Sequence, residues 1–356
     1  MNAHYESPQE KSTVVLALEP LSRFLDDPDL TEIVINRPGI VAVERQGRWE
    51  AHQLPTLDFD WCLDLAKLLR NRASQDITEA QPLLGAQLPD GQRVQVVIPP
   101  AVPGGTVSIT IRRPGSRVLA LRELIDAGAF KLARREQSLL LEQGERADLE
   151  AALPSMDREL LGLFHAGEWE RFFSLAVVGR KNIVSSGATG SGKTTLGNGL
   201  AALIPLHERI VTVEDVPEMR LPHENQVNLF YPKGGNGVSR LGPRELLEAA
   251  LRMRPDRVLL AELRGDESFF FIQNVLNSGH PGTITTVHAT RAKLAFRRLA
   301  LMIKGSPEGS GLDLADIATT LHALVDVVVQ MERLPDGQRV ASEIYFDPAF
   351  AMRQLG

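Results

Sequence analysis

The sequence predicts an α/β fold in two parts, with a smaller α+β domain over residues 1–128, a linker over residues 129–153 and a mostly parallel α/β domain over residues 154–356. Three observations support this. A glycine-rich loop lies between an apolar strand and a helix, apolar runs alternate with helical segments as far as Val325, and the residues before Pro154 are rich in charge. A chain of 356 residues also fits two domains.

The first domain combines short strands with one clear helix. Residues 31–43 read as two strands around the turn Asn36–Gly39, and Leu57–Asn71 reads as an amphipathic helix. Two further strands are expected at Val94–Ile98 and Thr106–Arg112. In the last strand apolar and polar residues alternate, so one face is expected in a core and the other, which carries Arg112, is polar.

The second domain begins its strand–helix alternation with the most specific motif of the chain. An apolar strand, Asn182–Ser186, precedes the motif, and a helix is expected from Thr195 to Leu203. The motif itself satisfies G-x-x-x-x-G-K-[ST] in full and consists of Gly187, Ala188, Thr189, Gly190, Ser191, Gly192, Lys193, Thr194 and Thr195. This strand–loop–helix context is the one that a phosphate-binding loop requires.

The loop chemistry indicates ATP and Mg²⁺ as cofactors. The glycines let backbone N–H groups point inward, and the helix N-terminus adds a partial positive charge. We expect Lys193 to reach the β- and γ-phosphates and the Thr194 hydroxyl to hold Mg²⁺.

Two more strands end in carboxylates that are candidates for catalysis. Ile210–Asp215 ends in Glu214 and Asp215, and Arg257–Glu262 ends in Glu262, with alanine where an aspartate usually holds Mg²⁺. Two assignments remain open at this point. Either Glu262 acts as both base and metal partner, or Glu214 and Asp215 share the task. A third strand, residues 283–288, ends in His288, which is a candidate for hydrogen-bonding a γ-phosphate or its leaving product, with a structural role as the open alternative.

These segments together resemble the traffic ATPases of type II and type IV secretion. The matching segments are Gly187–Thr195 for Walker A, Val213–Asp215 for the Asp box, Arg252–Gly265 for Walker B and Ser278–Ala289 for the His box. The alanine in Walker B is a trait of that family. Upstream, residues 31–39, 88–100 and 108–114 resemble the N-terminal domain of the type IV branch.

The resemblance implies a RecA-like P-loop NTPase as the C-terminal domain and a homohexameric ring. It implies nucleotide-binding roles for Arg93 and Arg112, which would contact phosphates. It further implies ATP hydrolysis that powers substrate transfer or pilus assembly in a secretion or conjugation system. Arg264, just after Glu262, is well placed to act across a subunit interface. The expected location is cytoplasmic, on the inner-membrane face, with components of the secretion complex as partners and the membrane surface as a further candidate.

Residue Arg93 also has a plainer interpretation. It lies in the heptamer Leu-Pro-Asp-Gly-Gln-Arg-Val, which occurs at Leu88–Val94 and again at Leu334–Val340. Pro-Asp-Gly between apolar runs is typical of a hairpin turn. Arg339, the counterpart of Arg93, has no expected role in nucleotide binding, so Arg93 as a simple hairpin residue stays open.

Composition limits the alternatives. The net charge of -6 and the lack of a basic–aromatic stripe argue against a helicase-like nucleic-acid motor and against sequence-specific nucleic-acid binding. A small-molecule kinase leaves the upstream domain unexplained, and the acidic residues with His288 argue against a non-enzymatic nucleotide sensor. The single Cys62 reads as a buried thiol, and no apolar run approaches the roughly 20 residues that span a bilayer.

Overall fold

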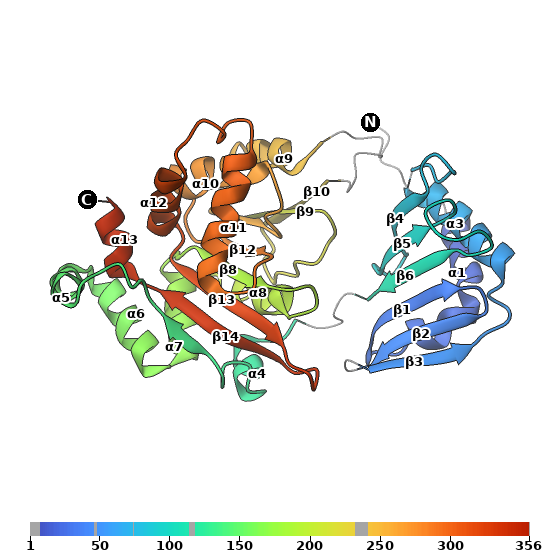
Figure 1. Ribbon diagram of the computed structural model, residues 1–356, viewed down its shortest axis with the longest axis horizontal. Helices are drawn as coiled ribbons and strands as arrows, with labels where there is room; N and C mark the ends of the chain where they lie inside the picture. Colours follow the sequence, from blue (N-terminus) through green and yellow to red (C-terminus); the bar gives the residue numbers. More distant parts are fainter. Residues whose placement is uncertain (1–7, 46–47, 74, 114–117, 232–240, 356) are drawn as a thin grey trace. The chain divides into compact units, whose positions relative to one another are not determined.

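The computed structural model describes residues 8–45, 48–73, 75–113, 118–231 and 241–355 (Figure 1). Contacts divide these residues into two units. Unit 1 holds the described residues up to Arg113, and unit 2 holds those from Val118 onward. The residues expected as a linker, 129–153, lie in unit 2, so the division by contacts falls upstream of residue 128. The predicted domain boundaries at residues 128 and 153 stay a prediction.

Unit 1 is built on an antiparallel sheet with the strand order β3-β2-β1-β6-β5-β4. The strands are β1 (Leu30–Arg37), β2 (Ile40–Arg45), β3 (Arg48–Gln53), β4 (Leu83–Gln87), β5 (Arg93–Val97) and β6 (Ser108–Arg112). Its helical segments are α1 (Pro8–Ala17), the 3₁₀ turn η1 (Glu19–Leu21), α2 (Ser22–Leu25) and α3 (Phe59–Ala73). The predicted strands and helix of this part are confirmed.

The core of unit 1 lies between the sheet and its helices. Ile109 and Ile111 of β6 are buried, as the alternation predicted, and they share a cluster with Leu65 and Leu69 of α3. Cys62 also lies in this core, where burial raises the pKa of its thiol to about 11. The thiol is therefore protonated and unreactive at neutral pH, as expected for a packing residue.

Unit 2 contains two sheet segments, ordered β10-β9-β11 and β12-β8-β13-β14-β7. The strands are β7 (Arg134–Glu136), β8 (Ile183–Gly187), β9 (Ile210–Glu214), β10 (Gln226–Phe230), β11 (Arg257–Leu260), β12 (Ile284–Val287), β13 (Val327–Arg333) and β14 (Arg339–Phe346). All pairings are parallel except β13 with β14, which confirms the mostly parallel α/β prediction. Next to β11 and β12, Leu263 N–H donates to the Thr286 carbonyl at 2.9 Å and links the segments.

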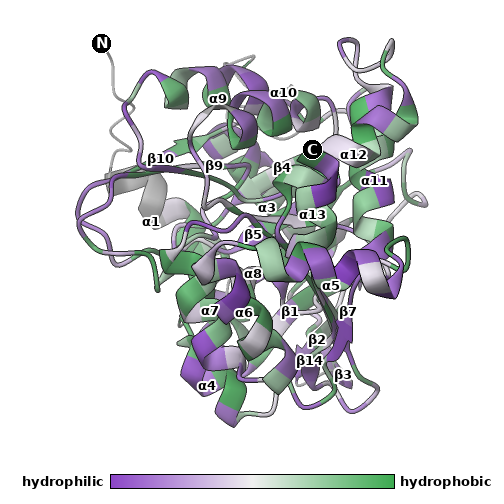
Figure 2. Cartoon of the chain, turned by 90° about the vertical axis from the view of Figure 1, so that its left-hand side faces the viewer, coloured by the Kyte–Doolittle hydropathy of each residue, from purple (hydrophilic) through white to green (hydrophobic). Residues whose placement is uncertain are grey.

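Helices cover both faces of this sheet. Successive strand residues point to opposite faces, and Ile183 and Val184 accordingly belong to two different hydrophobic cores. One face packs against α4 (Leu121–Asp126), α6 (Ser155–Ala166), α7 (Trp169–Val178) and α8 (Lys193–Ala201). The other packs against α9 (Pro243–Leu251), α10 (Glu267–Asn274), α11 (Ala292–Gly305) and α12 (Leu314–Leu324), with the 3₁₀ turn η2 (Leu276–Ser278) after α10. Figure 2 shows hydrophilic and hydrophobic residues mixed along α6 and α9, as amphipathic helices require.

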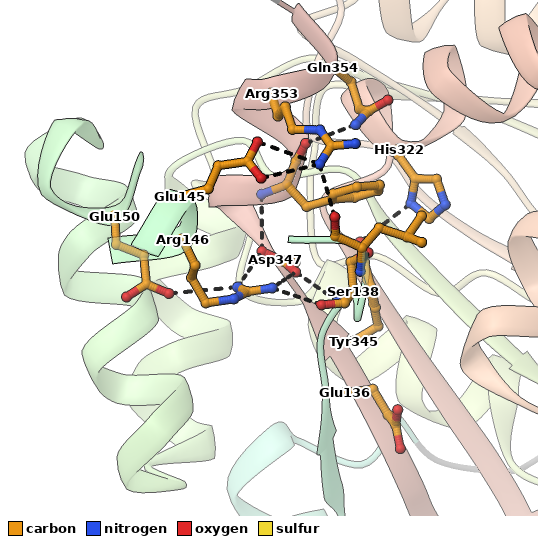
Figure 3. Close-up of polar contacts among 12 residues, drawn as sticks. Glu136, Ser138, Glu145, Arg146, Glu150, His322, Tyr345, Asp347, Arg353 and Gln354 are labelled. Carbon is orange, nitrogen blue, oxygen red and sulfur yellow. Dashed lines mark hydrogen bonds and ion pairs between the residues drawn. The ribbon is translucent and has the colours of Figure 1, made fainter. Parts of the chain in front are cut away.

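The expected linker contains β7 and α5 (Gln143–Ala152), and it is tied to the C-terminal helix α13 (Pro348–Leu355). The tie is Asp347, whose side chain is fully buried. Its two carboxylate oxygens accept from Arg146 at 3.0 and 2.9 Å and from the Ser138 and Phe350 N–H groups (Figure 3). A paired and hydrogen-bonded carboxylate is the form in which a buried charge is tolerated.

The repeated heptamer forms a hairpin turn in both places, as predicted. In the first copy Leu88 N–H donates to Gln92 O, and in the second Leu334 N–H donates to Gln338 O, each at 2.8 Å. The glycine of each turn, Gly91 or Gly337, has a φ near +90°. That conformation favours glycine, so the same sequence solves the same turn twice.

No helix within the described ranges is long and apolar enough to cross a bilayer.

Candidate nucleotide-binding site

The predicted phosphate-binding loop lies between the end of β8 and the start of α8, as its sequence indicated. Gly187, Gly190 and Gly192 all have positive φ, and a Cβ on Gly187 would collide with the Met331 carbonyl of β13. Glycine is therefore required by backbone conformation and by close approach. Since α8 begins at Lys193, its free N–H groups and positive dipole end face the loop.

The Lys193 side chain is buried within the loop. Its ammonium group donates to the Gly187 and Ala188 carbonyls, both at 2.8 Å, and lies 3.4 Å from His288 Nδ1. His288 Nδ1 is also 3.1 Å from the Gly187 carbonyl. The structure thus brings the predicted residues Lys193 and His288 together at one side of the loop.

Residue Glu262 lies on the other side of His288. Its Oε1 is 2.9 Å from His288 Nε2, and its Oε2 accepts from Arg264 at 2.8 Å. Arg264 also donates to Asp215 at 2.6 Å. Burial lowers the pKa of the Arg264 guanidinium, but the carboxylates of Glu262 and Asp215 outweigh this effect and raise the pKa above its usual range. Glu262 therefore sits between two positioned nitrogen groups, with Arg264 held by carboxylates of its own chain.

Glu214, for which a role in activating water or holding Mg²⁺ is predicted, is enclosed by donors from its own strand and the turn that follows. Glu214 is fully buried at the end of β9. Its carboxylate accepts from the Glu218 and Met219 N–H groups, each at 2.8 Å, and from the Thr212 hydroxyl at 3.0 Å. Burial raises the pKa of Glu214, and these hydrogen bonds oppose the rise. Glu214 thus closes the turn after β9.

The carboxylate that this turn presents to the loop is Glu218, which the sequence reasoning missed. Glu218 Oε2 accepts from the Thr194 hydroxyl at 3.1 Å, and its carbonyl accepts from Asn198 of α8 at 2.9 Å. The available signal was its place four residues after Glu214, beyond Pro217 in a loop that follows a strand end. Hydroxyl and carboxylate oxygens are the donor set that Mg²⁺ prefers, so Thr194 and Glu218 fit this ion.

Arg339, for which no role was expected, also contacts the loop. Its Nε donates to the Gly190 carbonyl at 3.0 Å, and its Cδ lies 3.1 Å from the position of a Cβ on Gly192. The second copy of the heptamer therefore places an arginine in contact with the phosphate-binding loop.

The remaining predicted residues, Arg93 and Arg112, lie in unit 1 as direct neighbours on β5 and β6. Residues directly opposite each other share a face of the sheet. Arg112 also lies 3.6 Å from Glu32 of β1.

Comparison with known proteins identifies the family. A family model described as "Type II/IV secretion system protein" matches residues 153–344. The type IV secretion system protein VirB11 of Bartonella henselae is 43% identical over 99% of this chain and 98% of its own length. The chain belongs to this family.

Solved structures agree with the assignment. The VirB11 ATPase of the Brucella suis type IV secretion system, crystallised with sulphate, is 41% identical and covers 96% of this chain and 99% of its own, with a TM-score of 0.52. The pilus retraction motor PilT with bound ADP is 18% identical over 95% of this chain and 86% of its own, with a TM-score of 0.58, which shows a shared fold. The chain is accordingly a traffic ATPase of the type IV secretion branch, and its α/β fold with a P-loop is confirmed.

Proposed function

We propose that this traffic ATPase hydrolyses ATP at the Gly187–Thr195 loop with Glu262 as the residue that orients and deprotonates the attacking water. The observation that supports this is the position of Glu262, between His288 Nε2 at 2.9 Å and Arg264 at 2.8 Å. Because His288 also reaches the Gly187 carbonyl at 3.1 Å, the carboxylate is tied to the loop that would hold the phosphates.

The other loop residues have supporting roles in the proposal. Lys193 would move its charge from the Gly187 and Ala188 carbonyls to the β- and γ-phosphates, where it stabilises the transferring group. Thr194 and Glu218 would hold Mg²⁺, which when bound neutralises phosphate charge. Glu214 would serve the site only by holding the turn that carries Glu218.

The division of labour between Glu218 and Glu214 is tested with two matched substitutions in the full chain. Glu218→Gln should raise the Mg²⁺ concentration for half-maximal ATPase activity by about 10–100-fold, while leaving the melting temperature near that of the wild type. Glu214→Gln should mainly lower the melting temperature, because its amide would face the Glu218 and Met219 N–H donors. A normal Mg²⁺ requirement for Glu218→Gln, with a raised one for Glu214→Gln, would reverse the assignment.

We further propose that Arg93 and Arg112 supply charge to the nucleotide phosphates. Their placement directly opposite each other supports this, since side chains at opposite positions lie on the same face of the sheet and can reach one ligand together. Charge-assisted hydrogen bonds from arginine to phosphate are short and directional.

The proposed setting is a homohexamer on the cytoplasmic side of the inner membrane, bound to components of a secretion or conjugation complex and in reach of the membrane surface. The support is the similarity over nearly the whole chain to VirB11 proteins of type IV secretion systems. Movement driven by the ATP cycle would power transfer of a protein or nucleoprotein substrate, or pilus assembly.

A further inference from the structure

A row of polar side chains crosses the buried sheet beneath α11. In the strand register, Ser186 of β8 is opposite Gln330 of β13, and Gln330 is opposite Glu343 of β14. Side chains at directly opposite positions lie on the same face. All three are at most 3% exposed, in a layer otherwise made of residues such as Val328 and Tyr345.

Gln330 joins this row to the turn that carries His288. Its Nε2 donates to the carbonyl of Ala289, the residue after His288, at 3.2 Å. Its Oε1 is buried, as is the Ser186 hydroxyl, and neither atom has a hydrogen-bond partner among the residues that the structure describes. A hydroxyl donor and an amide acceptor on neighbouring strands are complementary, so a small rotation or one buried water would connect them.

Glu343 holds the other end of the same turn. Its Oε2 accepts from Ala292 N–H, the first residue of α11, at 2.9 Å. Its Oε1 accepts from Arg134 of β7 at 2.7 Å. The residue before α11, Arg291, provides no side-chain cap, so Glu343 satisfies an N-terminal N–H group from across the core.

Residues 288–292 are therefore fixed from beneath at two points, Ala289 and Ala292. Since β12 ends at Val287, His288 is the first residue of this turn, and the two fixed points determine where its side chain lies. Ser186 immediately precedes Gly187, whose carbonyl contacts both Lys193 and His288. The polar row thus connects the strand leading into the phosphate-binding loop with the turn that presents His288 to Glu262.

We infer that Gln330 is a positioning residue for ATP hydrolysis, which sets His288 against Glu262 through its hydrogen bond to Ala289. This inference rests on the proposed function. A buried amide with an unsatisfied oxygen lowers stability, and methionine fills a similar volume without that penalty. Packing alone would therefore favour methionine at position 330, and the glutamine indicates that the site needs its hydrogen bond.

The test is a double-mutant cycle in the full chain, with Gln330→Met and His288→Ala alone and combined. Gln330→Met should lower kcat by about 10–100-fold, the effect of a small misplacement of a catalytic group, and leave ADP affinity unchanged. In the His288→Ala background Gln330→Met should lower kcat no further, because Gln330 acts on hydrolysis through His288, which is then absent. Thr285→Val is the matched control. Like Gln330→Met, it removes a buried polar oxygen that has no hydrogen-bond partner among the described residues, here on the strand leading to His288, and it should leave kcat unchanged.

Equal losses from Gln330→Met in both backgrounds, or a normal kcat in the single variant, would overturn the inference. If Gln330→Met lowers the melting temperature too far, Gln330→Asn retains the amide but is too short to reach Ala289, and the same cycle applies. Failure of the proposed function would show separately, as wild-type turnover by Glu262→Gln.

Discussion

Arginines 93 and 112 pose the clearest question at the scale of single residues. Sequence alone left Arg93 open as a hairpin residue, whereas the register places it directly opposite Arg112. We expect Arg112→Ala and Arg93→Ala each to raise the KM for ATP about tenfold, the loss of one charge-assisted contact. Steady-state ATPase assays on the full chain measure this, with Arg48→Ala, an exposed arginine of β3, as the control. A wild-type KM for Arg93→Ala would make it a turn residue only.

The residues of the site also show what a linear pattern can and cannot predict. Lys193, Glu262 and His288 could be predicted because each lies in a recognisable motif or at a strand end. The structure places His288 between the other two, 3.4 Å from the Lys193 ammonium group and 2.9 Å from the Glu262 carboxylate. Glu214 and Glu218 could not be told apart, since the difference depends on which carboxylate the turn after β9 buries. Arg339 was missed because its contact with Gly190 joins residues far apart in the chain.

At the scale of elements, α12 carries a half-buried histidine that makes stability depend on pH. His322 stacks on Phe296 of α11 at 4.1 Å, and its Nδ1 is 3.3 Å from the Tyr345 hydroxyl of β14. Burial lowers the pKa of His322 from 6.5 to about 4. The unfolded chain therefore binds more protons than the folded chain between these values, so the free energy of unfolding should fall as the pH falls from 6.5 towards 4.

Urea denaturation at pH 7 and pH 5 checks this expectation. His322→Phe should lose less stability between the two pH values than the wild type does, because phenylalanine has no proton to gain. His207→Gln, at an exposed position, should behave as the wild type does. An unchanged pH dependence in His322→Phe would assign the acid sensitivity to other groups.

The elements themselves were predictable to different degrees. Strands β8, β9, β11 and β12 were expected because each is a short segment rich in Val, Ile, Leu or Thr. Each is buried along its whole length, as is typical of strands covered on both faces. β7 was not expected, since Arg134–Glu136 consists of three charged residues and its strand partner, β14, lies more than two hundred positions later. For the antiparallel pair β13–β14 the sequence predicted the hairpin turn, because Pro-Asp-Gly is a local turn signal, but not the two strands.

At the scale of the whole molecule, the proposed ring makes a prediction about mass. Light scattering of the full chain with ATP and Mg²⁺ should approach six times 39.1 kDa, and specific ATPase activity should rise with protein concentration to a plateau. A nucleotide that binds the assembled form more tightly shifts the equilibrium towards it by mass action. A monomer with constant specific activity at all concentrations would exclude the ring.

The division of the chain into units could be predicted only in part from the sequence. Two units were expected from length and from the change in pattern, and contacts also give two. The segment around 129–153 was expected as a linker because it is charged and weakly periodic, yet Asp347 and Arg146 tie it to the end of the chain. Such pairing between distant charges leaves no local trace in the sequence.

The central claim is that Glu262 performs the chemical step at a phosphate-binding loop that binds nucleotide without it. The most direct measurement is ATP binding and ATP turnover by Glu262→Gln in the full chain, beside Glu159→Gln, an exposed glutamate of α6, as the control. We predict that Glu262→Gln binds ATP with near wild-type affinity and turns it over at least about a hundredfold more slowly, while Glu159→Gln does both normally. Wild-type turnover by Glu262→Gln would contradict the account.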